Sequence, residues 1–152
     1  MYMSKKRILS WIVVLLWMLL IFHLSSQAAE DSNQLSTGIT RVVVQTVERF
    51  LPDTDIDIGS VNHIVRKNAH FAAYLVLGVL VMNALRRSEV YGFRALAIAL
   101  GICVVYAISD EVHQLFVPGR GAQVKDVIID SLGAMVGAGL VLLKQSYKNQ
   151  TQ

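Results

Sequence analysis

Ionisable side chains gather between two apolar runs, in the stretch SDEVHQLFVPGRGAQVKDVIID at residues 109–130. Carboxylates, an amide and a guanidinium in one place can bind an anion, move a proton or hold a cation. At the centre of a bilayer an ionised side chain costs about 2.5–3.5 kcal/mol on insertion scales, so such groups are functional candidates by default. The stretch supplies six candidate residues: Asp110, Glu111, Gln114, Arg120, Asp126 and Asp130.

A second polar group stands at the start of the apolar run at residues 69–85. His70 and Tyr74 are four residues apart, which places them on one face of a helix, and Arg66 lies one turn earlier on that face. Lys67 follows Arg66 directly. We therefore add Arg66, Lys67, His70 and Tyr74 to the candidates.

The last apolar run carries a stripe of small residues. Asp126, Asp130, Gly133 and Gly137 follow a 4-3-4 spacing, so they share one helix face. Glycines four residues apart let two membrane helices approach closely. This face is expected to point into the helix bundle and to carry both carboxylates with it.

The composition places these elements in a membrane. Of the 152 residues, 54% are hydrophobic and 16% are charged, and the mean hydropathy is +0.50. Soluble domains carry about 25% charged residues. Four apolar runs are long enough to cross a bilayer. We predict an all-α, polytopic membrane helical bundle with spans at about 8–25, 68–86, 92–110 and 126–143.

Residues 28–66 form the one sizeable polar segment and are expected to lie outside the spans. Within it Leu35, Ile39, Val42, Val43, Thr46, Val47 and Phe50 recur at helical spacing. This pattern predicts one amphipathic helix on the membrane surface or on the bundle. Ser60 is expected to cap the helix that enters the second span. The whole chain, residues 1–152, is expected to form a single domain.

Three further patterns admit other interpretations. The basic start and apolar first run also describe a signal peptide, but its apolar core is about 7–15 residues and this run is longer, so we favour an uncleaved span. The acidic turn at 53–59 resembles a calcium loop only superficially, because Ile64 stands where a bidentate glutamate is required. Cys103 is the one cysteine, which excludes an intramolecular disulfide.

The basic residues predict the orientation of the spans. The two tails and the connection between spans two and three carry eight bases and one acid, whereas the other side carries six bases spread over two longer connections and ten acids. The termini are therefore expected in the cytoplasm and the polar residues on the outer face. The net charge of +3 does not indicate nucleic acid, because the bases flank apolar runs. The eight bases of the two tails and of the connection between spans two and three are Lys5, Lys6, Arg7, Arg86, Arg87, Arg94, Lys144 and Lys148.

Four motifs stand out along the chain. They are Ser25-Ser26-Gln27, Arg66-Lys67-Asn-Ala-His70-Phe71-x-x-Tyr74-x-x-Leu77-Gly78, Ser109-Asp110-Glu111-x-x-Gln114-x-Phe116-x-Pro118-Gly119-Arg120 and Asp126-x-x-x-Asp130-x-x-Gly133-x-x-x-Gly137. Together they resemble the VanZ-like family over nearly the whole chain, most weakly at 31–60. The resemblance implies a bacterial plasma-membrane protein of about four helices, in a family named for a member associated with low-level teicoplanin resistance. It supplies no reaction.

Three functions remain open from the sequence. The favoured one is an outward-facing pocket that binds or moves an anionic lipid-linked or envelope ligand, with Arg66, Lys67, Arg120 and Lys125 around it. A noncatalytic envelope factor, with a structural polar network, is the second. The third is an intramembrane hydrolase or transferase, in which His70, Asp110, Glu111 and Asp126 act as acid–base groups or metal ligands. No catalytic motif is present, so we assign no catalytic residue, cofactor or metal site.

Overall fold

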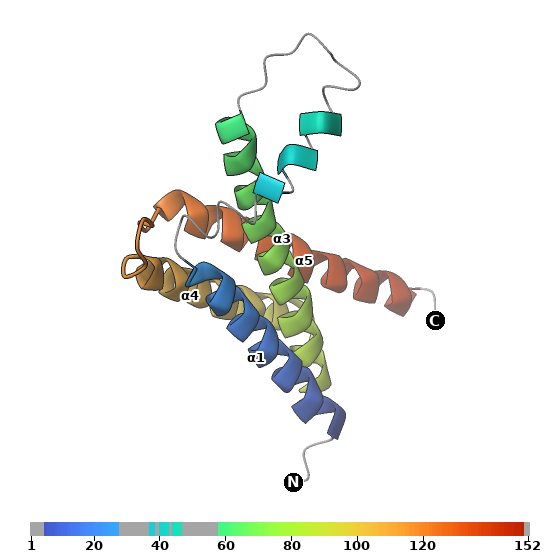
Figure 1. Cartoon of the computed structure of the whole chain (residues 1–152). Helices are drawn as coiled ribbons and strands as arrows, with labels where there is room; N and C mark the ends of the chain where they lie inside the picture. The colour runs from blue at the N-terminus through green and yellow to red at the C-terminus, as the bar shows by residue number, and fades with distance from the viewer. Residues whose placement is uncertain (1–4, 28–36, 39, 43, 47–57, 151–152) are drawn as a thin grey trace.

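The chain folds into a bundle of long helices in the computed structural model, which describes residues 5–27, 37–38, 40–42, 44–46 and 58–150 (Figure 1). Four helices in the described residues are each long and apolar enough to cross a membrane. No strand occurs in these described residues. The predicted all-α membrane bundle is thus confirmed. The helices are α1 (Lys5–Ser25), α3 (Ile58–Arg87), α4 (Gly92–Gln114) and α5 (Val124–Gln150).

The helices run past the predicted spans, since helical backbone hydrogen bonding continues into polar sequence that the apolar runs do not mark. The structure places Ile58 at the start of α3, inside the segment predicted to lie outside the spans. The predicted cap at Ser60 is therefore wrong, because this residue already lies within the helix. Helix α4 continues beyond the predicted end of its span, residue 110, as far as Gln114. Asp110 and Glu111 are therefore helical residues, and the helix fixes the directions of their side chains.

The described residues 37–38, 40–42 and 44–46 are helical and belong to the predicted outer helix. Thr40 and Val44 are buried, and the hydroxyl of Thr40 donates to Asn62 Oδ1 of α3 at 3.2 Å. Val42 remains 62% exposed. The other apolar residues of that prediction (Leu35, Ile39, Val43, Val47 and Phe50) and the acidic turn at 53–57 lie outside the described residues.

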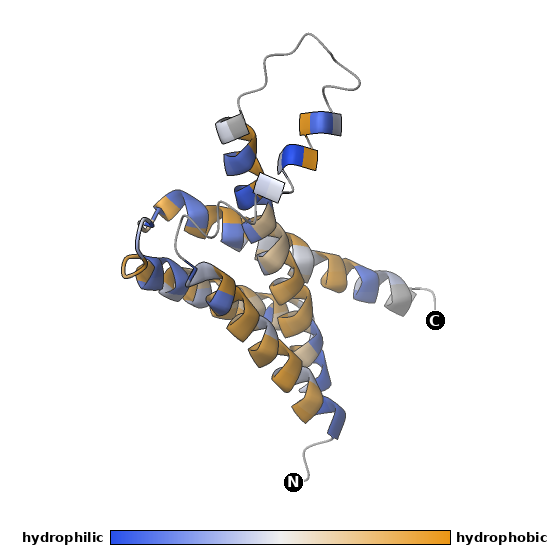
Figure 2. Ribbon diagram, viewed as in Figure 1, coloured by the Kyte–Doolittle hydropathy of each residue, from blue (hydrophilic) through white to orange (hydrophobic). Residues whose placement is uncertain are grey.

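Tryptophan side chains attach α1 to the rest of the bundle. Trp17 Nε1 donates to the carbonyl oxygen of Ala73 at 2.9 Å, and Trp11 Nε1 donates to Ser88 Oγ at 3.1 Å. The second bond joins the first half of α1 to the turn between α3 and α4. Hydrophobic residues make up most of the length of the long helices (Figure 2). Many of them are exposed, for example Leu19 at 62%, as expected where lipid is the solvent.

Helices α3 and α5 approach each other backbone to backbone, as the glycine stripe predicts. Side chains cannot fit between them, because each of three glycines faces a carbonyl oxygen of the other helix. A Cβ at Gly133 would collide with Phe71 O, one at Gly137 with Leu75 O, and one at Gly78 with Ala134 O. Asp130 shares this face and is fully buried.

Replacing Gly137 should therefore weaken the bundle. We expect Gly137→Ala to lower the free energy of unfolding by about 1–3 kcal/mol, because the added methyl group must push α3 away. Gly139→Ala is the matched control, since nothing lies within 4 Å of a Cβ there. It should leave stability unchanged or raise it by up to about 1 kcal/mol through helix propensity. Thermal unfolding of both variants in detergent tests this, and equal melting temperatures would contradict the packing.

Candidate functional site

A polar cleft opens where α3, the start of α5 and the connection between α4 and α5 meet. Its volume is about 90 Å³. One water molecule needs about 10–15 Å³ of such space, so the cleft has room for a small polar group. The lining residues are Arg66, Lys67, His70, Gln114, Gly119, Arg120, Gly121, Gln123, Asp126, Ile129 and Asp130.

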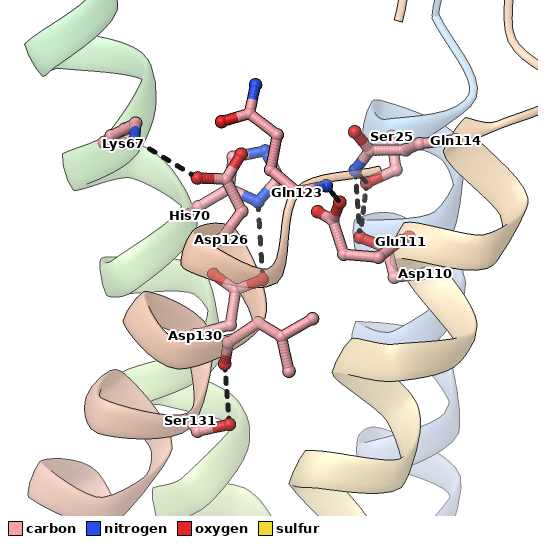
Figure 3. Close-up of polar contacts among 11 residues, drawn as sticks. Ser25, Lys67, His70, Asp110, Glu111, Gln114, Gln123, Asp126, Asp130 and Ser131 are labelled. Carbon is pink, nitrogen blue, oxygen red and sulfur yellow. Dashed lines mark hydrogen bonds and ion pairs between the residues drawn. The ribbon is translucent and has the colours of Figure 1, made fainter. Parts of the chain in front are cut away.

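An imidazole from α3 meets one buried carboxylate from α4 and one from α5 at the base of the cleft. We call His70, Asp110 and Asp130 the floor, although Asp110 lies beneath the lining and does not line the cleft itself. His70 Nδ1 of α3 lies 3.7 Å from Asp130 Oδ2 of α5, and Asp110 reaches the same place from α4 (Figure 3). One ligand atom from each of the three lies within 4.8 Å of the others. Both carboxylate oxygens of Asp130 and one of Asp110 are buried without a hydrogen-bond donor. This arrangement can hold a cation or exchange a proton.

Ser25 at the end of α1 completes the other side of the floor. Its hydroxyl donates to Asp110 Oδ2 at 2.7 Å (Figure 3). Gln114, one turn after Asp110, places its amide nitrogen 3.4 Å from Ser25 Oγ and 3.5 Å from the same carboxylate oxygen. Both carboxylate contacts fix the direction in which Asp110 points.

Glu111 fastens the connection between α4 and α5. Its Oε2 accepts a hydrogen bond from the backbone N–H of Gln123 at 2.7 Å. Glu111 is buried, with 3% of its surface exposed. Gln123 is the residue just before α5. The contact therefore holds the connecting hairpin down over the floor.

Basic side chains form the rim of the cleft. Lys67 Nζ lies 3.3 Å from Asp126 Oδ1. Among the described residues, no carboxylate lies within ion-pair distance of Arg66 or Arg120. Burial and the neighbouring charge of Arg66 lower the pKa of Arg120. A guanidinium stays protonated throughout the physiological range, so two unpaired positive charges share the rim.

The glycine turn at the rim brings the side chain of Arg120 and the backbone of Gly119 and Gly121 to the cleft. Gly119 has a φ of 73°, which glycine adopts without strain. The N–H of Arg120 donates to the carbonyl oxygen of Val117 at 3.1 Å, so this N–H is not available to an anion.

Seven of the ten predicted residues line the cleft, and Tyr74, Asp110 and Glu111 do not. These three are buried. Tyr74 faces the ring of Tyr106, with centroids 6.1 Å apart. Lys125, expected beside the pocket, is exposed and does not line it. The seven predicted residues that line the cleft are Arg66, Lys67, His70, Gln114, Arg120, Asp126 and Asp130.

Besides the turn glycines Gly119 and Gly121, two lining residues lie outside the predicted set, Gln123 and Ile129. Gln123 acts at Glu111 through its backbone, which side-chain patterns do not reveal. Ile129 is an apolar residue in an apolar run, so nothing distinguishes it from lipid-facing neighbours. Ile129 does stand three residues after Asp126, and this spacing on a helix face is the one signal that could have indicated it.

A sequence model of the VanZ/LLP1 family matches residues 10–145. The match spans α1, the polar segment and the other three helices almost to the end of α5. Searches of curated proteins and of solved structures found no match to this chain.

Removing the hydroxyl that orients Asp110 should destabilise the bundle. We expect Ser25→Ala to lower the free energy of unfolding by about 1–3 kcal/mol, because a buried carboxylate oxygen loses its donor. Ser26→Ala is the control, since Ser26 donates to the carbonyl oxygen of His23 within the same turn. It should change stability by less than about 0.5 kcal/mol. Thermal unfolding compares the two, and a loss as large in Ser26→Ala would contradict the role of Ser25.

Proposed function

The chain belongs to the VanZ/LLP1 family, and we propose that its cleft binds the phosphate-bearing headgroup of a membrane lipid or lipid-linked envelope precursor. The observation that carries this proposal is a pair of guanidiniums on one small cleft, Arg66 and Arg120, with no carboxylate partner among the described residues. Guanidiniums bind phosphate oxygens in bidentate pairs, which are among the stronger hydrogen bonds in proteins.

Repulsion between the two guanidiniums favours an anion between them. Lys67 is already paired with Asp126, so Arg66 and Arg120 are the rim cations left for a ligand. A phosphate oxygen between them replaces a repulsive contact with two attractive ones. In a partly desolvated cleft these attractions are stronger than in water.

The surroundings of the cleft favour a lipid over a free anion. Phe116 in the hairpin is 80% exposed and Val124 at the start of α5 is 78% exposed. Apolar side chains beside a polar cleft suit a ligand whose headgroup enters while its chains stay in the bilayer. A volume of about 90 Å³ suits a phosphate group, whereas a whole glycopeptide is much too large. Any effect on teicoplanin would therefore act through an envelope lipid.

We further propose that the protein lies in a bacterial plasma membrane with cytoplasmic termini and the cleft on the outer side. The excess of bases near the span ends of the two tails and of the turn between α3 and α4 supports this orientation. Arg87 Nη1 donates to the carbonyl oxygen of Lys6, which supports a common side for the N-terminal tail and that turn.

A structural role for the polar residues is the alternative, and one observation favours it. The contacts Ser25–Asp110, His70–Asp130 and Glu111–Gln123 link all four long helices. A polar network of this kind can lock a bundle in one arrangement without acting on a ligand. On this alternative the changes that matter would act on stability alone.

Binding of short-chain phosphatidic acid to purified full-length protein tests the proposal. We expect Arg120→Ala to weaken binding about 10-fold or more, because one charged hydrogen bond contributes about 1.5–3 kcal/mol. Arg94→Ala is the matched control, since Arg94 is exposed near the start of α4 and lies outside the cleft. Inorganic phosphate as a competitor separates recognition of the phosphate from recognition of the chains.

Wild-type affinity in Arg120→Ala would overturn the proposal. Weaker binding accompanied by a large loss of thermal stability would favour the structural alternative instead. Expression in a teicoplanin-sensitive bacterium then tests the link to resistance: the wild-type chain should raise the inhibitory concentration and Arg120→Ala should not. If the wild-type chain leaves the inhibitory concentration unchanged, the resistance role is wrong. Lipid binding is then judged by the phosphatidic acid measurement alone.

A further inference from the structure

Three buried carboxylate oxygens at the floor of the cleft accept no hydrogen bond. Asp130 has no exposed surface, and neither of its oxygens accepts a hydrogen bond, although its Oδ2 lies 3.7 Å from His70 Nδ1. Asp110 is 2% exposed, and its Oδ1 has no donor either. An unsatisfied buried acceptor is costly, and most so when it is charged. We propose that His70, Asp110 and Asp130 bind a divalent transition-metal ion, Zn²⁺ or Mn²⁺.

The positions of the three side chains fit one ion. A ligand atom from each lies within 4.8 Å of the other two. Ligands of a tetrahedral ion, each about 2.0–2.2 Å from it, are about 3.3–3.6 Å apart. The three ligand atoms must therefore close by about 1 Å to reach bonding distance, a shift that side-chain rotation can supply.

The charge of the floor favours a dication. Asp110 and Asp130 are two buried carboxylates, and Lys67, the lysine that lines the cleft, is paired with Asp126. A protonated His70 would balance one carboxylate and could donate to Asp130 Oδ2, but it would still leave Asp110 Oδ1 and Asp130 Oδ1 without donors. A divalent ion balances both charges, takes the unpaired oxygens as ligands and accepts the neutral imidazole as a third ligand.

The ligand set indicates which ions fit. A ligand set of one imidazole and two carboxylates suits Zn²⁺ and Mn²⁺ better than it suits Ca²⁺ and Mg²⁺, which prefer sites made of oxygen ligands alone. Ser25 supplies the outer contact that such ligands usually have, because its hydroxyl holds Asp110 Oδ2. His70 and Asp130 also line the cleft, so a bound ion would be reachable by an oxygen of a ligand. The ion is nevertheless expected to bind without any ligand present.

Metal analysis of the full-length protein tests the inference. Protein in detergent is stripped with a chelator, dialysed against Zn²⁺ or Mn²⁺, and assayed by elemental mass spectrometry and thermal unfolding. We expect about one ion per chain, a raised melting temperature, and tighter binding of Zn²⁺, which follows the general affinity order. His70→Ala and Asp130→Asn should weaken binding at least 100-fold.

Two controls distinguish the floor from adventitious surface binding. His63→Ala removes an exposed histidine of α3, and Glu89→Gln removes an exposed carboxylate of the turn between α3 and α4. Both should retain the ion. The inference would be overturned if folded wild-type protein bound neither Zn²⁺ nor Mn²⁺. It would also be overturned if His70→Ala and Asp130→Asn retained as much ion as the wild-type protein.

A milder variant keeps the test decisive if the ligand variants fail to fold. Ser25→Ala leaves all three ligands in place and should weaken ion binding about 10–100-fold, as loss of an outer contact does. Wild-type affinity in that variant would then overturn the inference. Metal content is measured without added lipid, so its failure is distinct from a failure of phosphatidic acid binding.

Discussion

The backbone contact between α3 and α5 is the constraint on which the site depends. His70 precedes Phe71, whose carbonyl oxygen lies where a side chain of Gly133 would stand. Asp130 is one turn before Gly133 on α5. The close approach therefore sets the imidazole against the carboxylate, and a larger residue at the glycine would separate them. Packing in the apolar part of the bundle thus determines the chemistry at its end.

The connection between α4 and α5 turns this contact into a cleft. Without it, His70 and Asp130 would form a polar spot on the side of two helices. The bond from the Gln123 N–H to Glu111 holds the hairpin above the floor, and Gly119 directs the chain so that Arg120 lines the same space. Positive charge at the rim and negative charge at the floor suit a ligand that carries a phosphate and an ion that balances the carboxylates.

The sequence predicts the bundle well, because four apolar runs and a lipid solvent leave few other folds, and the glycine stripe correctly predicts the buried face of α5. Helix ends are predicted less well: Ile58 starts α3 in polar sequence. Spacing along one helix places Arg66 and His70 together, but their distances to Asp110 and Asp130 depend on how three helices cross. The backbone contact of Gln123 has no side-chain signature at all.

We propose that rim and floor act as one site, with the phosphate of the ligand directly above the ion. The ³¹P linewidth of short-chain phosphatidic acid bound to Mn²⁺-loaded protein tests this directly, with Zn²⁺-loaded protein as the diamagnetic reference. We expect strong broadening of the phosphate resonance in the Mn²⁺ form. Phosphatidic acid that binds with the same affinity to both forms, and shows the same ³¹P linewidth in both, would contradict it.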